Sequence, residues 1–406
     1  MDNSKKCELL SPAGDMERLI MDLHYGADAV YLAGQRYGMR AAAGNFSEEE
    51  LAKAVEMAHK KGVKVYVTCN TLPREDELEG LPYYLGFLQE AGADALIIAD
   101  LGVLETAKKA APKVKKHVST QLGVINSATA NALYALGADT VVLARETPLE
   151  DIRKIRANTP EDLRIEAFVH GAMCVSFSGR CLLSNYLTGR DANRGQCAQP
   201  CRWKYHLVGE TRPGEYYEIT EDGGTYILNS RDMCMIEHIP ELIDAGVTSF
   251  KIEGRMKSAY YAAVVTNAYR QAIDAALTGK PLDRLWVEET EKLSHRPYTT
   301  GFYYGDPGQH YEATSYYSLT DVAAVVEDCD GERNAVLTQR NKFFRGDELE
   351  LLIPGEKPVK FTVEKMTNAE GEEIEDTRHA MMEIRMKLPV CAPKYSVVRK
   401  YRKAEK

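Results

Sequence analysis

Residues 26–34, GADAVYLAG, join a glycine to a short apolar run, and the same phrase returns three more times along the chain. The other copies are 92–100 (GADALIIAD), 137–145 (GADTVVLAR) and 246–254 (GVTSFKIEG). Each copy follows a segment with the apolar periodicity of a helix. Glycine is the usual residue after the last turn of a helix, because it adopts positive φ without a Cβ penalty. The repeated phrase therefore predicts four junctions at which a helix leads into a strand.

The strands of the four copies are near-continuous apolar runs, which are typical of a parallel sheet with both faces buried. Four further strand-like segments complete the pattern: CELLSP (7–12), VKVYVTCN (63–70), KKHVSTQ (115–121) and RIEAFVH (164–170). About eight strands, with helices between most of them, predict an α/β fold, a TIM-like (β/α)8 barrel over residues 1–280. A doubly wound open sheet is the alternative. Its glycine-rich dinucleotide fingerprint is absent after the first strand, where SPAGD stands.

Cysteines gather in one part of the 406-residue chain, between residues 166 and 201, within a predicted loop insertion at about 171–225. Four of the nine cysteines lie there and a fifth follows downstream: Cys174, Cys181, Cys197, Cys201 and Cys234. An odd total in a long chain with no apolar leader does not suit a disulfide scaffold. Neighbours such as Gly, Ser, Arg and Asn do not suit buried structural cysteines either. A metal site is the favoured interpretation.

Soft thiolates select zinc or iron–sulfur clusters. Structural zinc sites usually combine two Cys-x-x-Cys pairs, and the chain has none. Uneven spacing over loops rich in glycine and serine suits a 4Fe–4S cluster better, because loop amides can hydrogen-bond the cluster sulfurs. Cys174, Cys181 and Cys197 are the expected ligands, and the short spacing from Cys197 to Cys201 favours Cys201 as the fourth.

In a TIM barrel the functional residues lie at the carboxyl ends of the strands. Polar residues stand at nearly every predicted strand end, which indicates a lined mouth. A capping or salt-bridge role is the alternative for each of them, and Asp100 in particular could cap the following helix. We expect His170 and Glu253 to be catalytic. Five residues are expected to bind substrate: Asn70, Gln121, Arg145, Arg255 and Lys257.

Arg255 and Lys257 are expected to open the helix that follows the eighth strand, over residues 258–277. The start of a helix offers unpaired backbone N–H groups and a positive dipole, which favour an anion. Arginine adds bidentate recognition of a carboxylate or phosphate. An anionic substrate site is therefore predicted here, with ordinary salt bridges to Glu253 as the alternative.

The pattern changes at residue 318, where apolar and polar residues begin to alternate between turns. Residues 318–406 are predicted to form a small all-β barrel of five or six strands, joined to the first domain by a polar connector at 281–317. HRPYTTGFYYG (295–305) could stack on RNA bases or plug a domain junction. Basic residues of the β domain suggest an RNA grip, with solvated surface charge as the default: Arg340, Lys342, Arg345 and the tail KYRKAEK.

Composition sets limits on partners. Hydrophobic residues make up 44% of the chain, and no apolar run approaches the roughly 18 residues of a membrane span. We expect a soluble cytoplasmic protein with no membrane partner. The net charge of -9 does not suggest a general nucleic-acid binder, so an RNA site would have to be a local basic patch.

The run Glu166-x-Phe-x-x-Gly-Ala-Met-Cys-x4-Gly-x-Cys-x-Leu-Ser184 resembles the signature of the collagenase-like peptidase superfamily, whose members are grouped with peptidases of unknown catalytic type. Four other stretches resemble its tRNA-hydroxylation branch: ELLSPAGD (8–15), NRGQCAQPCRW (193–203), KIEGRMKS (251–258) and HRPYTTGFYYG (295–305). The resemblance thus runs from about residue 8 to past residue 310. It implies the same barrel, and the all-β module looks like the family's C-terminal domain.

The resemblance implies an iron–sulfur enzyme that hydroxylates a uridine of tRNA, at the wobble position, with the dicarboxylate prephenate as co-substrate. In related quinone-hydroxylation proteins the fourth cluster ligand lies well downstream, which makes Cys234 the preferred fourth ligand over Cys201. Hydroxylation of ribosomal RNA or of a quinone precursor is an alternative, as is the peptidase activity in the family's older name. A thiol peptidase would need Cys174 beside a base such as His170, and a Cys174 bound to iron is no free nucleophile.

Overall fold

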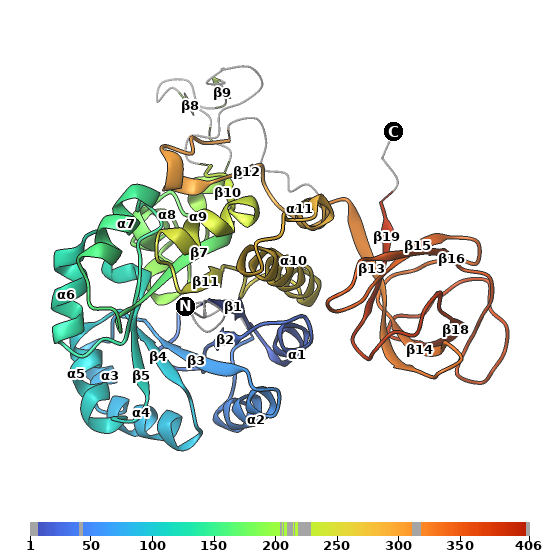
Figure 1. Cartoon of the computed structure of the whole chain (residues 1–406), viewed down its shortest axis with the longest axis horizontal. Helices are drawn as coiled ribbons and strands as arrows, with labels where there is room; N and C mark the ends of the chain where they lie inside the picture. The colour runs from blue at the N-terminus through green and yellow to red at the C-terminus, as the bar shows by residue number, and fades with distance from the viewer. Residues whose placement is uncertain are drawn as a thin grey trace.

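The computed structural model describes residues 7–39, 44–203, 205, 207–208, 214, 216–217, 229–310 and 318–402. Its first part is a closed barrel of parallel strands with helices outside (Figure 1). In order around the barrel the strands are β1 (Glu8–Pro12), β2 (Ala29–Leu32), β3 (Lys64–Cys69), β4 (Ala95–Ile98), β5 (Lys115–Val118), β6 (Thr140–Val142), β7 (Arg164–Ala172) and β11 (Ser249–Ile252). β11 pairs with both β7 and β1 and closes the sheet. The predicted TIM-like barrel is confirmed.

The α-helices mostly follow the barrel strands. They are α1 (Met16–His24), α2 (Glu48–His59), α3 (Glu75–Leu78), α4 (Leu81–Glu90), α5 (Leu101–Ala110), α6 (Ser127–Ala135), α7 (Leu149–Ala157), α8 (Leu183–Thr188), α9 (Ile239–Asp244), α10 (Ala259–Leu277) and α11 (Arg284–Glu291). In the described part of the chain, none of them combines the length and apolarity that crossing a bilayer requires.

The repeated phrase has a structural role in all four copies. Its glycines have positive φ, as predicted: Gly26 (99°), Gly92 (86°), Gly137 (100°) and Gly246 (89°). The side chain of the residue two positions later accepts a hydrogen bond from a backbone N–H of the neighbouring strand, at 2.8–3.2 Å, and so holds that strand in place. The pairs are Asp28 with Leu9, Asp94 with Val65, Asp139 with Lys116, and Thr248 with Ile165. The phrase therefore ends each helix and fixes the position of the next strand against its neighbour.

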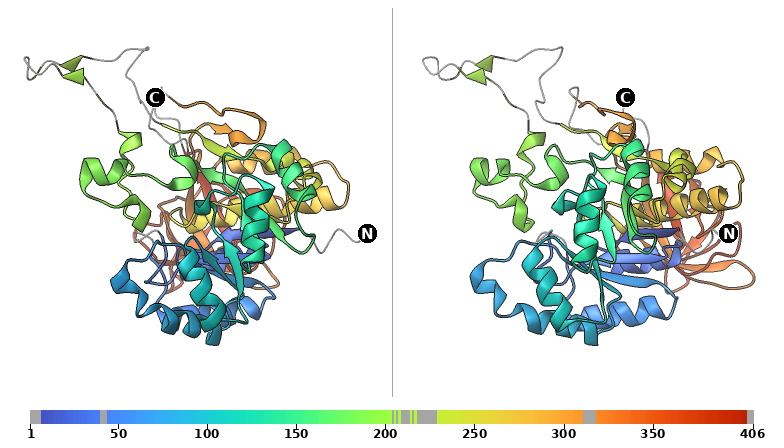
Figure 2. Two further views of the ribbon diagram at one scale, coloured as in Figure 1. Left: turned by 90° about the vertical axis from the view of Figure 1, so that its left-hand side faces the viewer. Right: turned by 60° about the vertical axis from the view of Figure 1, so that its left-hand side comes forward.

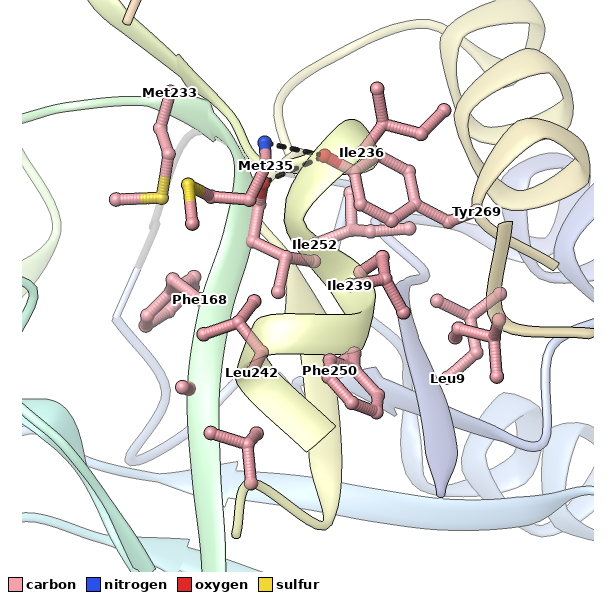
Figure 3. Close-up of a cluster of buried hydrophobic side chains, with 14 of the residues drawn as sticks. Leu9, Phe168, Met233, Met235, Ile236, Ile239, Leu242, Phe250, Ile252 and Tyr269 are labelled. Carbon is pink, nitrogen blue, oxygen red and sulfur yellow. Dashed lines mark hydrogen bonds between the residues drawn. The ribbon is translucent and has the colours of Figure 1, made fainter. Parts of the chain in front are cut away.

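A buried apolar cluster fixes the last barrel strand. Phe250 and Ile252 of β11 pack with Leu242 of α9, inside the group of side chains shown in Figure 3. The hydroxyl of Tyr269 on α10 donates to the carbonyl of Val169 at 2.7 Å and accepts from the Met235 amide at 3.0 Å. Each fully buried side chain of this size contributes about 1.5–3 kcal/mol. This packing and these hydrogen bonds thus hold β7 and β11 in place at the mouth of the barrel.

An extension of the sheet beside β7 was not predicted. β10 (Asp232–Cys234) pairs antiparallel with β7, and β12 (Tyr298–Thr299) pairs with β10. Arg296 is buried and its Nη2 lies 2.6 Å from Oδ1 of Asp232. Arg296 is therefore committed to a buried ion pair, so the arginine of the run 295–305 does not support the hypothesis that this run stacks on RNA bases.

The second domain is all-β, as the alternation predicted, and its described strands form an antiparallel half-barrel of seven strands rather than five or six. Its strands are β13 (Thr320–Cys329), β14 (Asn334–Gln339), β15 (Glu348–Leu352), β16 (Val359–Thr362), β17 (Met366–Thr367), β18 (Glu383–Lys387) and β19 (Val397–Tyr401), in the order β16-β15-β19-β13-β14-β18-β17. A separate two-stranded piece, β8 (Leu207–Val208) and β9 (Tyr216–Tyr217), lies within the insertion. The connector contains α11 and β12.

The half-barrel docks on the α10 and α11 side of the barrel (Figure 1). Arg399 of β19 is fully buried between Glu289 of α11 and Glu350 of β15. Its guanidinium nitrogens lie 2.7 Å from the Glu289 carboxylate and 2.5 Å from the Glu350 carboxylate. The Tyr25 hydroxyl also crosses the junction and donates to the carbonyl of Leu352 at 3.2 Å. Buried polar contacts of this kind fix the relative position of the two domains.

The basic residues expected to grip RNA from the second domain are paired with carboxylates. Arg340 pairs with Glu17, Lys342 with Asp376, and Arg345 with both Glu373 and Glu375. Residues 403–406 of the basic tail lie outside the described residues. Carboxylates thus neutralise the positive charge of all three side chains.

Candidate functional site

A cavity of about 510 Å³ lies at the carboxyl ends of the barrel strands. One wall comes from the strand ends and the loops that follow them, and the other comes from residues 174–202 of the insertion. Figure 2 shows the insertion, in green, as a lobe that stands beside the barrel. Arg194 ties this lobe to α3, the short helix after β3, through an ion pair with Glu77. A mouth of this size and position is the usual place for an active site in this architecture.

Four cysteines line the cavity: Cys174, Cys181, Cys197 and Cys201. Three of them accept a hydrogen bond from the backbone N–H two residues further on. The donors are Ser176 to Cys174 at 3.4 Å, Leu183 to Cys181 at 3.3 Å, and Gln199 to Cys197 at 3.3 Å. Backbone donors aimed at sulfur stabilise the thiolate form, which is the form that binds a metal.

Cys201 and Cys234 differ in their surroundings. Burial raises the pKa of the Cys201 thiol, Arg202 lowers it, and the nearby Cys174, Cys197 and Cys181 raise it again. Cys201 lines the same cavity as the other three cysteines. Cys234 does not line the cavity; its sulfur lies 3.8 Å from the Tyr269 hydroxyl and 3.9 Å from that of Thr290. The geometry favours Cys201, and not the preferred Cys234, as the partner of the other three.

The cysteines do not form a site for a single ion. Within the described ranges, no three His, Cys, Asp or Glu side chains converge closely enough to bind one metal ion. A 4Fe–4S cluster makes a different demand, because its four thiolates bind different irons of a larger body. Four cysteines around one cavity, three of them with backbone donors to sulfur, fit that demand.

The cavity lining is strongly cationic. Among the residues that the structure describes, it contains one carboxylate, Glu253, and five cations: Arg145, Arg202, Lys251, Arg255 and Lys257. Nη2 of Arg145 lies 2.8 Å from Oε2 of Glu253, and its guanidinium stacks 3.9 Å from the ring centre of Phe168. The lining therefore carries a surplus of positive charge, which suits an anionic ligand.

Arg255 and Lys257 both line the cavity as predicted, but from the turn that precedes α10 rather than from the helix itself. Arg255 is buried and donates to the Thr68 hydroxyl at 3.3 Å. The SPAGD loop touches its backbone: a Cβ on Gly14 would stand 2.0 Å from the Arg255 carbonyl oxygen. Burial lowers the pKa of Lys257, whose Nζ donates to the Ser294 carbonyl. Only glycine at position 14 permits this placement of Arg255.

The two predicted amide residues meet at the mouth. Nδ2 of Asn70 donates to Oε1 of Gln121 at 2.9 Å, and both side chains line the cavity. Asp100 instead caps α5, because Oδ1 accepts from the Val103 amide at 3.0 Å. The capping alternative is therefore confirmed for Asp100.

The structure does not bring His170 to the cavity. A β-bulge shifts the register between β7 and β11, so that Phe168 lies opposite Lys251 while His170 lies opposite Ile252. The extra residue turns His170 out of the barrel, where its ring nitrogens lie 3.3 Å from the hydroxyls of Tyr269 and Tyr298. The catalytic role predicted for His170 does not agree with this position.

The same placement bears on the thiol-peptidase alternative. Both ring nitrogens of His170 face tyrosine hydroxyls, whereas Cys174 is exposed at the cavity wall. Among the described residues, the cavity lining includes no histidine. A cysteine–histidine pair of the kind that activates a thiol nucleophile is therefore absent from this wall.

Burial of His170 should make the free energy of unfolding depend on pH. Burial lowers its pKa to about 3, so at pH 5.5 the unfolded chain holds a proton on this ring and the folded chain does not. The contribution is present above the unfolded pKa of about 6.5 and is lost as the pH falls below it. Going from pH 7 to 5.5 should cost about 1 kcal/mol from this residue alone.

Urea unfolding at the two pH values should show a smaller loss for His170→Phe than for the wild type. His170→Asn, which keeps a hydrogen-bonding side chain, serves as a second variant without the titrating ring. An equal loss in all three proteins would contradict this description of His170.

Two cavity residues were not singled out from the sequence. Nζ of Lys251 lies 2.6 Å from Oε1 of Glu166 and 4.6 Å from the ring centre of Tyr31, on the inner side of the barrel. Arg202 stands next to Cys201 in the insertion wall. A lysine inside an otherwise apolar strand, SFKI (249–252), was the available signal for Lys251.

Comparison with known proteins gives matches over most of the chain. Residues 14–313 match the model of peptidase family U32, and residues 319–399 match that of the peptidase family U32 C-terminal domain. A Bacillus subtilis protein named tRNA hydroxylation protein P1 is 40% identical, with 95% of this chain and 92% of that protein covered. The Escherichia coli tRNA hydroxylation protein P is 39% identical, with 90% of each covered. The Escherichia coli 23S rRNA 5-hydroxycytidine C2501 synthase is 37% identical over 87% of this chain and 54% of its own length.

Proposed function

The chain belongs to peptidase family U32, and we propose that it is an RNA-modifying enzyme that hydroxylates a uridine of tRNA, at the wobble position. The observation that carries the proposal is the barrel mouth itself, where a cysteine wall faces a cationic wall across one cavity. Relatives that match nearly the whole chain are named tRNA hydroxylation proteins, which supports RNA as the substrate.

We assign a 4Fe–4S cluster to Cys174, Cys181, Cys197 and Cys201. The common cavity and the three N–H···S contacts support this set, and the separate position of Cys234 argues for Cys201 as the fourth ligand. When bound, such a cluster supplies one-electron redox chemistry. The protein's own contribution is to hold the thiolates, to surround them with amide donors, and to present Arg202 beside them.

The cationic wall is assigned to a dicarboxylate co-substrate, prephenate. Arg255 offers a planar fork of donors and Lys257 a second cation near it in the same lining, so two carboxylates have two partners. Glu253 and Arg145 hold each other in place and shape the side of the pocket. Asn70 and Gln121 offer amide groups of the kind that recognise the edge of a base.

Replacing Arg255 with glutamine should weaken prephenate binding by about 10- to 100-fold, because a hydrogen bond to a charged group contributes about 1.5–3 kcal/mol. The measurement is the concentration of prephenate that raises the thermal midpoint of the purified protein. Lys154→Gln, on the exposed face of α7, is the matched control and should behave as wild type. An unchanged midpoint shift in Arg255→Gln would remove this residue from the site.

The function is tested with protein purified without oxygen, incubated with prephenate and with tRNA from cells that lack the gene. Digestion to nucleosides and mass spectrometry should show a uridine heavier by one oxygen atom. Hydroxylated ribosomal nucleosides in place of tRNA ones would redirect the substrate. Unmodified RNA together with Cys174-dependent cleavage of peptides would reject the proposal and support the peptidase activity.

A further inference from the structure

The outer surface of the insertion is unusual in its apolar exposure. Helix α8 buries Ser184 completely, and the Ser184 hydroxyl accepts the Ala198 amide, so the polar side of this helix faces the cysteine loops. Its other side exposes 79% of Tyr186, with Leu182 one turn earlier also exposed. The arrangement is the reverse of an ordinary surface helix, which buries its apolar side.

Further aromatic side chains lie on the same lobe. Phe177 is 50% exposed and Trp203 is 43% exposed, on the two sides of α8 in the sequence. We call Leu182, Tyr186 and Trp203 the outer face of the insertion; the Phe177 ring instead lies against Gly123, in the turn after β5. Apolar surface gathered on one short segment is a mark of an interaction site.

The charge of this segment identifies the partner. Residues 174–203 contain four arginines and one aspartate, in a chain whose net charge is -9. Arg180 and Arg190 are exposed, and neither forms an ion pair with any residue that the structure describes. Aromatic faces beside cations are what single-stranded RNA requires, because its bases stack on rings and its phosphates bind guanidinium groups.

The second domain offers a weaker surface for the same partner. Arg345 lies near Glu373 and Glu375, and Arg378 near Asp376, so these cations are already balanced. The insertion is therefore the better match to a polyanion, and it forms the wall of the cavity that would receive the target base.

We propose that the outer face of the insertion, with Arg180 and Arg190, binds the unpaired strand of the RNA substrate and leads it to the barrel mouth. The inference rests on the proposed function for the identity of the RNA. Phosphates contact the two arginines, and bases stack on the exposed ring of Tyr186. The lobe that holds the cysteines is then also the lobe that grips the substrate.

The test measures tRNA affinity of the full-length, iron-loaded protein by fluorescence anisotropy at several salt concentrations. The double variant Arg180→Gln/Arg190→Gln should bind about tenfold more weakly and should lower the salt slope by about 1.4, since each phosphate contact on a single strand contributes about 0.7. Tyr186→Ala should weaken binding by about tenfold and leave the slope unchanged. The matched control, Arg345→Gln/Arg378→Gln, should bind as wild type. Iron content reports whether each variant is intact.

Wild-type affinity and slope in all insertion variants would overturn the inference, and loss of binding in the control alone would move the RNA site to the second domain. A Tyr186→Ala variant that turns a dimer into a monomer with unchanged RNA affinity would identify the outer face as a contact between copies, which also overturns it. Failure of the proposed function is seen separately, as wild-type protein that binds tRNA through these residues but adds no oxygen to it.

Discussion

Replacing Cys201 with alanine should remove most of the iron from the protein, while Cys234→Ala should keep it. The reason is position: Cys201 lines the cavity with Cys174, Cys181 and Cys197, whereas the Cys234 sulfur lies against the Tyr269 and Thr290 hydroxyls. Protein purified without oxygen should contain about four irons per chain in the wild type and in Cys234→Ala. Iron and acid-labile sulfide analysis, with the visible absorption spectrum, gives the answer directly.

Cys391→Ala is the matched control, because this exposed cysteine lies in the second domain, after β18. Full iron in Cys201→Ala together with loss in Cys234→Ala would reverse the ligand assignment. Absence of iron from the wild type would reject the cluster altogether.

Replacing Arg399 with methionine should lower the free energy of unfolding by about 3–5 kcal/mol, since it leaves two buried carboxylates without their main partner. Arg399 is fully buried between Glu289 and Glu350 at the junction of the domains. Arg385→Met is the matched control: its pair with Glu383 is about half exposed and should contribute less than about 1 kcal/mol. Urea unfolding of both variants measures the difference.

The loss should be partly restored when Glu350→Gln is added to Arg399→Met, because one unpaired carboxylate is then removed while Glu289 keeps its ion pair with Lys292 at 2.7 Å. Equal stability of Arg399→Met and Arg385→Met would show that the junction does not depend on this ion pair.

Much of the barrel could be predicted because its signals are local. A glycine that ends a helix, an aspartate or threonine two residues later, and a run of apolar residues recur at 26, 92, 137 and 246. Each element depends on nearby residues only, so the pattern is visible in the chain. The cavity positions of Asn70, Gln121, Arg145, Glu253, Arg255 and Lys257 followed from the rule that strand ends meet at one mouth.

The features that could not be predicted depend on residues far apart in the sequence. His170 would face the barrel interior like Glu166 and Phe168 if β7 alternated regularly, and one bulged residue reverses it. Arg296 appears as a polar residue in a loop, but Asp232 of β10 buries it. The choice between Cys201 and Cys234 likewise depends on how the insertion folds back over the mouth, which spacing does not encode.

The proposed tRNA hydroxylation is tested by nucleoside mass spectrometry of tRNA from cells that lack the gene, with complementation. A hydroxylated uridine, or its further-modified forms, should disappear in the deletion strain. Wild-type protein should restore it, and Cys201→Ala should not. A full set of hydroxylated nucleosides in the deletion strain would rule out this function, and restoration by Cys201→Ala would rule out Cys201 as an essential cluster ligand.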